Sequence, residues 1–435
     1  MKRRVFIKKT LLTGSALWLS SFRNLFAKGM FSDEVGEKWE GWKKGQFQVH
    51  FIYTGAGESM FYIFPDGTSM LLDCGDFNAG ARGKLAVPIL PNAERHAGEW
   101  IARYVERVNP HGKEVDYMML SHYHNDHSGD HRFFVKEEER DGKPYQLSGF
   151  ALAAEYLHFG KAFDRAYPTY DDPIDATRFS SNGLRLIKRF YEYQTKNNNL
   201  IVERFQVGAN NQVCMLYSPH DYSNFNIFNV CGNGRIASAD GTIHDLYKGM
   251  IDKNTTGSLD ENAMSLGMVI SYGPFRFFTA GDFYGSYTSL DGKKVGLEDE
   301  IASVLPPCHV SKVNHHGHNA MTKKIIQALR SKVYVSCVWD QLHNLDATMK
   351  RLSDRTIYPG DRYLCPTIMP EERRQTDGDK EWMKDVVPDT FTGSHVILNV
   401  DKRGKRYSIS FISAEDEEMI VKSVLKFRTK EPPSI

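Results

Sequence analysis

The sequence lacks a surplus of either charge, closely spaced cysteines and any long apolar run. Its 55 lysine and arginine residues are balanced by 54 aspartate and glutamate residues, which leaves a net charge of +1. This balance argues against a protein that coats nucleic acid by bulk electrostatics. The six cysteines occur without a C-x-x-C pair. Their scatter favours small buried side chains over a disulfide framework or a zinc knuckle.

The apolar content is sufficient for a folded protein. Of the 435 residues, 41% are hydrophobic and 25% are charged. This composition is typical of globular chains rather than disordered ones. The length allows one large domain or two ordinary ones.

The N-terminal segment predicts an export signal over residues 1–29. Residues 2–9 are rich in lysine and arginine, and the apolar stretch 11–19 that follows is too short to span a bilayer comfortably. The pair Arg3-Arg4 resembles a twin-arginine signal, so we expect a periplasmic or extracellular protein with no stable membrane span after signal removal. The alternative is a mildly basic N-terminal helix. Residues 30–45 are polar and are interpreted as a connector.

The strongest signal for chemistry is a cluster of four residues behind an apolar run. His122, His124, Asp126 and His127 follow the strand-like segment 117–120. If the chain leaves this strand extended, His122 and His124 point the same way, while Asp126 and His127 reach a second position on the tightening turn. Imidazole and carboxylate are ligands of hydrolytic divalent metals, above all zinc. The spacing therefore predicts two adjacent metal sites, the alternative being surface histidines on a polar loop.

Short strands and a helix surround this segment. Residues 47–53, 60–64 and 69–73 form β-type runs separated by glycine-containing turns, and 97–108 has the apolar spacing of an amphipathic helix. The third run ends in Asp73, which on local grounds alone could be a turn or capping aspartate.

The H-x-H-x-D-H segment resembles the signature of the metallo-β-lactamase superfamily. The resemblance implies an α/β (α+β) fold, a four-layer αββα sandwich with two packed mixed β-sheets flanked by helices. We expect the catalytic domain to span 46–345, with an insertion around 132–210. Residues 346–435 would form a C-terminal extension whose β-hairpin, joined by a turn at 401–404, packs on the main fold.

The resemblance also implies roles for residues outside the histidine cluster. Asp73 would orient the histidine loop by hydrogen bonding. His220, after the strand-like run 213–217, is a candidate ligand of the first metal, or else a loop histidine. Asp282 would bridge both metals, because a carboxylate has two oxygens.

The final motif contains three histidines, His315, His316 and His318. His316, which precedes a glycine, is favoured to complete the second metal position, and His315 remains open. His318 could donate a proton to the leaving group or simply lie on the surface. His343 follows a later strand and is a candidate substrate contact.

Within the superfamily, the chain most resembles the metallo-β-lactamase domain of ComEC-type competence proteins. The resemblance rests on the runs at residues 51–59, 71–75, 122–127, 262–266, 281–282 and 315–317. It departs from that group in having His124, which implies a fuller first metal site.

The resemblance implies metal-assisted hydrolysis with two divalent ions, zinc being the expected metal. A water between the metals would become hydroxide and attack the substrate, and Asp126 could orient it. By analogy we expect a phosphodiester, either a small molecule or a nucleic acid. The alternatives are a cyclic amide or ester, as for a β-lactamase or lactonase, and a non-catalytic metal-binding protein on the same scaffold.

Overall fold

The structure is a computed structural model that describes residues 33–430, apart from residue 54 and the segments 78–86, 248–258, 289–291, 293 and 341–342. The expected export signal lies outside the described residues. Among the described residues, no helix combines the length and apolar character needed to cross a membrane.

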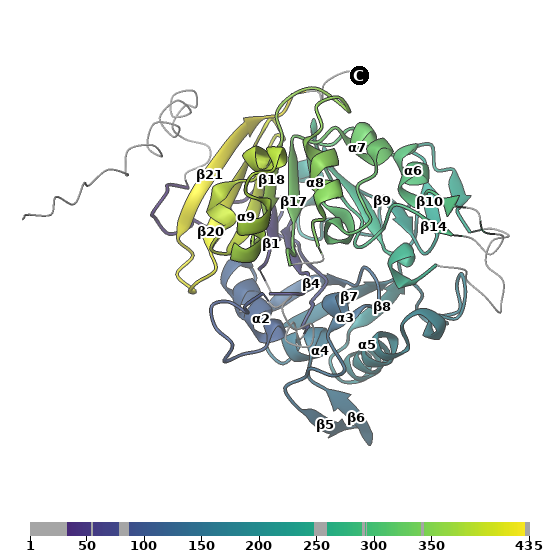
Figure 1. Cartoon of the computed structure of the whole chain (residues 1–435). Coiled ribbons are helices and arrows are strands. Elements are labelled where there is room, and N and C mark those ends of the chain that lie inside the picture. The colour runs from purple at the N-terminus through teal and green to yellow at the C-terminus, as the bar shows by residue number, and fades with distance from the viewer. Residues whose placement is uncertain are drawn as a thin grey trace, which may run out of the picture. The chain divides into compact units, whose positions relative to one another are not determined.

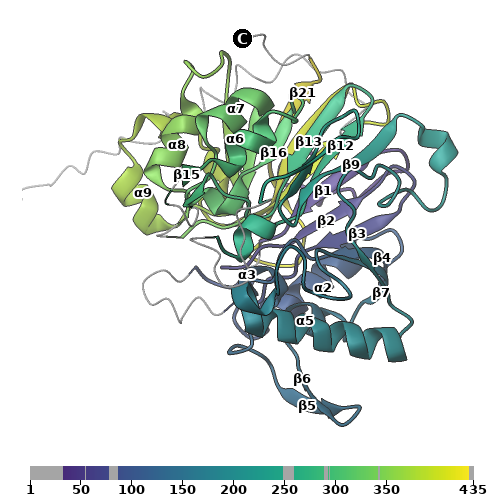
Figure 2. The same ribbon diagram turned by 90° about the vertical axis from the view of Figure 1, so that its right-hand side faces the viewer.

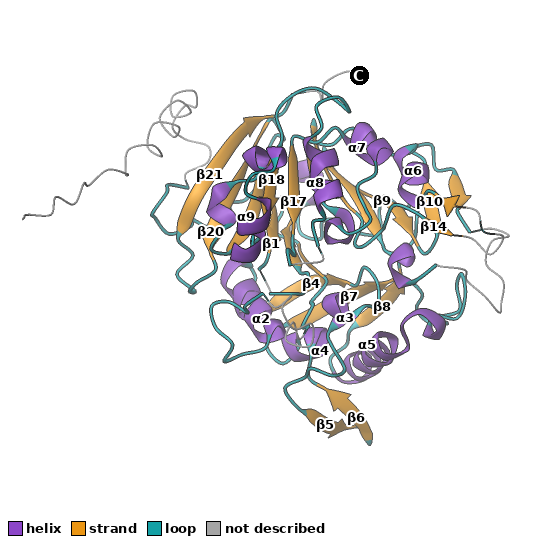
Figure 3. Cartoon of the chain, viewed as in Figure 1, coloured by secondary structure: helices purple, strands orange, loops and turns teal. Residues whose placement is uncertain are grey.

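Two large mixed sheets dominate the described part of the chain (Figures 1 and 3). The first has nine strands in the order β21 (Val421–Arg428), β20 (Arg406–Ser413), β19 (Ser394–Val400), β1 (Phe47–Phe51), β2 (Met60–Ile63), β3 (Ser69–Leu72), β4 (Glu114–Met119), β7 (His158–Asp164) and β8 (Ile201–Arg204). The second has eight strands in the order β11 (Ile243–Asp245), β10 (Arg235–Ala237), β9 (Phe225–Gly232), β12 (Gly267–Tyr272), β13 (Phe275–Thr279), β16 (Val310–Lys312), β17 (Val333–Ser336) and β18 (Tyr363–Pro366).

Smaller elements lie between these strands. The helices are α2 (Ala97–Val108), α3 (Asn125–Ser128), α4 (Gly149–Ala153), α5 (Thr177–Asn197), α6 (Leu297–Ala302), α7 (Lys323–Leu329), α8 (Asp346–Ser353) and α9 (Glu371–Asp377). Short 3-10 helices are η2 (Pro219–Tyr222), η3 (Glu261–Met264), η4 (Asn314–Gly317), η5 (Glu381–Asp385) and η6 (Pro388–Thr390). Two small hairpins pair β5 (Glu137–Arg140) with β6 (Lys143–Gln146) and β14 (Tyr287–Thr288) with β15 (Lys294–Val295).

The alternation of side chains along the strands produces the layers. In β3, Met70 packs between the two sheets while Leu71 packs under α2 and α5. In β13, Phe277 faces the other sheet while Phe278 packs against α6, α7 and α8. Because successive residues of a strand point to opposite faces, each sheet buries both sides. Figure 2 shows the sheets between two groups of helices, so the expected four-layer fold is confirmed.

The direction of the strands brings the chemistry to one edge. β3 and β4 are parallel neighbours in the first sheet, and β13 and β16 are parallel neighbours in the second. Parallel strands end at the same edge, so the segments that follow them lie close together. Those segments carry Asp73, residues 121–127, Asp282 and residues 314–318.

The termini of the described chain belong to one sheet. β19 pairs antiparallel with β1 along the whole length of β1, from Phe47 opposite Val400 to Phe51 opposite Val396. The segment 132–210 also contributes to this sheet, because β7 and β8 extend it beyond β4. The strand-like run 213–217 is an irregular segment instead of a strand.

A chain that stops before Ser394 is expected to fail to fold. Loss of residues 394–430 would remove the strands β19, β20 and β21. The buried side chains of β1, such as Val49 and Phe51, would then lack their neighbours Leu398 and Val396. Circular dichroism and urea unfolding of the truncated and full chains check this. A cooperative transition at the full-length midpoint in the truncated protein would contradict it.

Candidate metal centre

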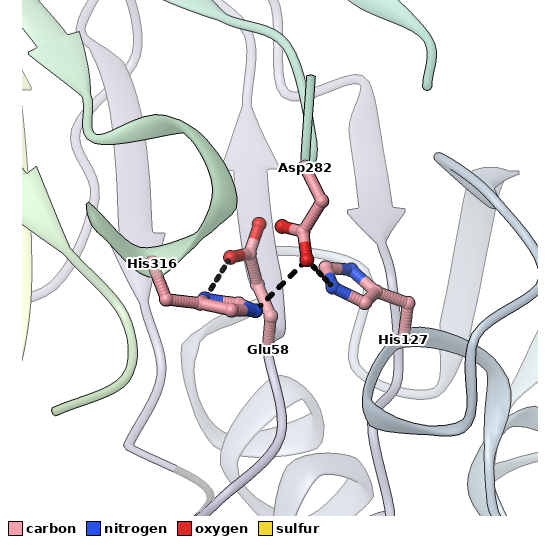
Figure 4. Close-up of side chains that lie close together, drawn as sticks. All are labelled: Glu58, His127, Asp282 and His316. Atoms are coloured by element: carbon pink, nitrogen blue, oxygen red, sulfur yellow. Dashed lines mark ion pairs between the residues drawn. The ribbon is translucent and has the colours of Figure 1, made fainter. Parts of the chain in front are cut away.

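Four buried side chains from four segments meet at the shared edge of the sheets (Figure 4). The ligand atoms of Glu58, His127, Asp282 and His316 all lie within 4.8 Å of one another. Glu58 lies between β1 and β2, His127 in α3, Asp282 after β13 and His316 in η4. The cluster therefore depends on the packing of both sheets.

Asp282 is the common neighbour of the two histidines. Its Oδ2 lies 3.2 Å from Nε2 of His127 and 3.2 Å from Nε2 of His316. Asp126 Oδ2 lies 3.7 Å from the same His316 nitrogen. The Nε2 atoms of both histidines are buried without a hydrogen-bond partner. Two imidazole nitrogens and carboxylate oxygens that converge in this way fit a divalent cation of the zinc type.

Asp73 fixes the orientation of His127. Its Oδ2 lies 2.7 Å from His127 Nδ1, and its two oxygens accept hydrogen bonds of 2.7 Å from the backbone N–H and the hydroxyl of Ser121. With Nδ1 donating to Asp73, Nε2 keeps its lone pair for a metal. Burial lowers the pKa of His127, but the charges of Asp282 and Asp73 outweigh it and hold that pKa well above its usual value.

The backbone is strained at the same places. Asp73, His315 and His316 have φ values of 60°, 45° and 47°. Residues other than glycine rarely adopt this left-handed region, and such outliers persist where the surrounding structure holds them. Their concentration around the cluster is typical of a functional site.

His122 and His124 form a second, smaller group beside the cluster. His122 Nε2 lies 3.2 Å from His124 Nδ1, and the His122 and His127 rings are 4.2 Å apart. Burial, together with the neighbouring His127 and His124, lowers the pKa of His122 well below its usual value, so its imidazole is neutral and able to ligate. Within the described ranges, no third metal-ligating side chain completes a group around this pair.

The structure does not bring His220 to the centre. His220 is exposed in η2. The preceding backbone N–H groups of Leu216 and Tyr217 donate to Thr68 Oγ1 and Asp66 Oδ2, in the turn between β2 and β3. That turn is at the opposite end of β3 from Asp73, so His220 lies at the wrong end of the sheet for a ligand.

The remaining predicted histidines surround His316. Nε2 of His315 lies 3.2 Å from the side-chain amide of Asn262, which places it outside the four-residue cluster. His318 is half-buried, with its ring 5.2 Å from that of His315. His343 is buried, with its ring 5.0 Å from that of His316 and its Nδ1 3.0 Å from Asp340 Oδ1.

Sequence reasoning missed two residues of the centre, Glu58 and Lys312. Lys312 Nζ donates to the carbonyl of Gly281 at 2.6 Å and lies 3.0 Å from Glu58 Oε2. Both side chains are fully buried. The available signal was a lysine inside the apolar strand 310–313, since lysine is almost never fully buried unless it is paired.

A cavity of about 1040 Å³ adjoins the centre. His315 and His318 form part of its wall, together with Tyr284 and Asp260. Lys294, Lys323 and Lys324 also line it and give the wall cationic character.

Glu298 holds the loop that carries His316. Its buried carboxylate accepts hydrogen bonds from the Asn314 side chain at 2.9 Å and from the backbone N–H groups of Met321 and Thr322 at 2.9 and 2.7 Å. It therefore joins both ends of the segment 314–322. Burial raises the pKa of Glu298 to about 7, although these three donors lower it.

The comparisons with known proteins agree with this geometry in part. Residues 53–188 match the family model described as the metallo-beta-lactamase superfamily. Residues 53–188 thus resemble the metallo-β-lactamase superfamily, and the matched stretch contains Asp73 and residues 122–127 but neither Asp282 nor His316. No curated protein matches the chain.

Two solved structures resemble the chain weakly. One is the CmlA beta-hydroxylase E377D mutant, with 10% identity and a TM-score of 0.36 over 75% of this chain and 53% of that one. The chain thus spans about half the length of that hydroxylase. The other is a protein of unknown function from Enterococcus faecalis V583, with 11% identity and a TM-score of 0.27 over 78% of this chain and 86% of that one.

Replacing Asp73 by asparagine is expected to weaken metal binding by about 10- to 100-fold. The amide keeps the shape but loses the charge that fixes His127 with its Nε2 lone pair free. Competition with a chromophoric chelator measures the affinity. His220→Ala is the matched control, and an equal loss in both variants would contradict the assignment.

Glu298 is expected to make stability fall as the pH rises. Its pKa is about 7 in the folded protein against an ordinary value of 4.5. The folded state therefore holds the proton more tightly, and the stability that this proton contributes is lost as the pH rises from about 4.5 to about 7. Urea unfolding of chelator-treated wild type and Glu298→Gln from pH 4.5 to 8 measures this. Parallel pH profiles for the two proteins would refute the prediction.

Proposed function

We propose that the protein is a metal-dependent hydrolase that cleaves phosphodiester bonds with two divalent cations, zinc being the expected metal. The convergence of His127 Nε2 and His316 Nε2 on Asp282 Oδ2, in a buried place, carries this proposal. The superfamily match over residues 53–188 supports it.

The residues fit the metals in two groups. His127 and His316, with Asp126 and Asp282, would hold one cation, and His122 and His124 would hold the other beside Asp282. Such cations lower the pKa of water and stabilise negative charge that develops on a phosphoryl oxygen. Asp73 keeps His127 in the ligating tautomer.

Asp126 is placed to orient an attacking water. Its carboxylate borders His316 and is only partly exposed, with 14% of the side-chain surface accessible. Burial raises its pKa, but the contacts with His316 and His127 outweigh that effect and hold the pKa well below its usual value. Asp126 therefore stays ionised, and it can orient an attacking water by accepting a hydrogen bond from it. His318, on the cavity wall, would donate its N–H to the leaving oxygen.

The charge of the cavity favours an anionic substrate. Lys294, Lys323 and Lys324 share the cavity wall with Asp260 and Asp299, and Lys324 is 3.2 Å from Asp299. Lys294 and Lys323 are therefore the cations best placed to meet the phosphate of a small molecule or of a nucleic-acid strand. The ring of His343 lies 5.0 Å from that of His316, and we propose that His343 contacts the substrate. A neutral cyclic amide or ester gains less from these lysines.

We propose that the protein is exported through the twin-arginine-like signal at residues 1–29 and acts in the periplasm or outside the cell. We also propose that it is a free-standing relative of the ComEC-type domain. The described residues 46–430 would act as one catalytic unit that includes the C-terminal strands.

Hydrolysis of bis(p-nitrophenyl) phosphate by the purified mature protein tests the proposal. Turnover should require bound metal, disappear with a chelator and return with zinc. Asp126→Asn should lower kcat by about 100-fold or more at saturating zinc, because the charged carboxylate that ligates the metal and orients the water is lost. Metal content, measured on the same samples, separates weakened metal binding from a slower chemical step.

Nitrocefin and a lactone serve as competing substrates in the same assay. Cleavage of nitrocefin or the lactone without cleavage of the phosphodiester would show that the substrate is a cyclic amide or ester and not a phosphodiester. Bound metal with no turnover of any of the three would favour a binding protein, and absence of bound metal would remove the mechanism.

A further inference from the structure

Lys312 joins three segments of the metal centre from behind. It ends β16, just before the loop with His316, and is fully buried. Its ammonium donates to the carbonyl of Gly281 at 2.6 Å and lies 3.8 Å from Asp282 Oδ1 and 3.0 Å from Glu58 Oε2. A buried ammonium is stable only if its charge is paired, and here both partners are carboxylates of the centre.

Glu58 meets His316 on the side away from the other ligands. Its Oε2 lies 3.2 Å from Nδ1 of His316, whereas Nε2 of the same ring faces Asp282 (Figure 4). Asp126 Oδ2 also lies 3.7 Å from that Nε2. An imidazole that ligates through Nε2 turns Nδ1 away from the metal. A cation held by His127 Nε2 and His316 Nε2 would therefore contact the ring nitrogen of His316 that does not face Glu58.

The arrangement is similar to the one around His127, although the Glu58 contact is a longer ion pair and not a hydrogen bond. There, Asp73 lies 2.7 Å from Nδ1 and leaves Nε2 for Asp282. Carboxylates on the rear nitrogens of ligating histidines fix the ring and raise its basicity. The two pairs differ in their surroundings, because Ser121 donates to Asp73 while Lys312 neutralises Glu58.

The charges explain why both members are needed. A bare ammonium this close to Asp282 would repel a divalent cation, and a bare buried carboxylate would be poorly solvated. As a pair, Glu58 provides the carboxylate beside His316 and Lys312 cancels its charge. The pair then adds little net charge near the metal.

We propose that Glu58 and Lys312 are a charge-balanced pair of positioning residues, in which Glu58 orients His316 through Nδ1 and Lys312 compensates Glu58, so that neither ligates the metal. The inference rests on the metal centre proposed above but not on its substrate.

A double-mutant cycle tests the pair. Zinc affinity, by competition with a chromophoric chelator, and the visible spectrum of the cobalt-substituted protein are measured for wild type, Glu58→Gln, Lys312→Met and the double variant. Glu58→Gln should lower zinc affinity by about 10-fold or more, because it leaves the ammonium uncompensated. The double variant, which is neutral and of similar size, should recover to within about 10-fold of wild type with the wild-type cobalt spectrum.

The cycle also distinguishes a direct ligand role. If Glu58 ligates the metal, the double variant loses as much affinity as Glu58→Gln and its cobalt spectrum changes, which overturns the proposal. Should either single variant fail to fold, the comparison of the double variant with wild type decides between the same two results. Full zinc binding without phosphodiester turnover would remove the proposed substrate and leave this inference intact.

Discussion

The buried negative charge around Asp282 is the constraint on which the rest of the site depends. Four buried or largely buried carboxylates contact the two histidines of the cluster or Lys312: Glu58, Asp73, Asp126 and Asp282. Lys312 supplies an ammonium beside Glu58 and Asp282. Burying so many carboxylates is unfavourable unless cations or protons compensate them. The acidic neighbours of His127 and His316 raise the pKa values of both imidazoles against the effect of burial, which shows that the cluster favours added positive charge. A divalent metal would balance this charge and would coordinate the Nε2 atoms of both histidines, which have no hydrogen-bond partner.

The fold satisfies this constraint by bringing loops from both sheets to one edge. β3 and β4 deliver Asp73 and the histidine segment, while β13 and β16 deliver Asp282 and His316. Buried bonds then fix the loops: Ser121 and Asp73 beneath His127, Glu298 beneath the His316 loop, and Lys312 between Gly281 and Glu58. His315 and His318, the neighbours of His316 in the chain, line a cavity whose wall also carries lysines. A hydrolytic site needs ligand loops that are held rigidly and a space through which the substrate reaches them.

The sequence predicted the parts of the site that are local. His122–His127 could be recognised because the ligand types follow one another directly after a strand, and the helix expected at 97–108 is α2. Asp282 and His316 could be placed only through their order in the family resemblance. Glu58 and Lys312 were missed because their pairing joins residues far apart in the chain. His220 was misplaced because the run before it alternates like a strand, with Val213 and Met215 buried and Cys214 and Leu216 exposed. The run is not a strand, and the backbone N–H of Leu216 donates to the side chain of Thr68.

The most direct test of the account is anomalous X-ray diffraction at the zinc absorption edge from crystals of the zinc-loaded protein. The account predicts an anomalous peak among His127 Nε2, His316 Nε2 and Asp282 Oδ2, and a second one beside His122 and His124. Glu58 should remain beside Lys312 and away from both peaks. Peaks confined to the surface, with the buried cluster empty, would contradict the central claim that this edge of the two sheets is a metal centre.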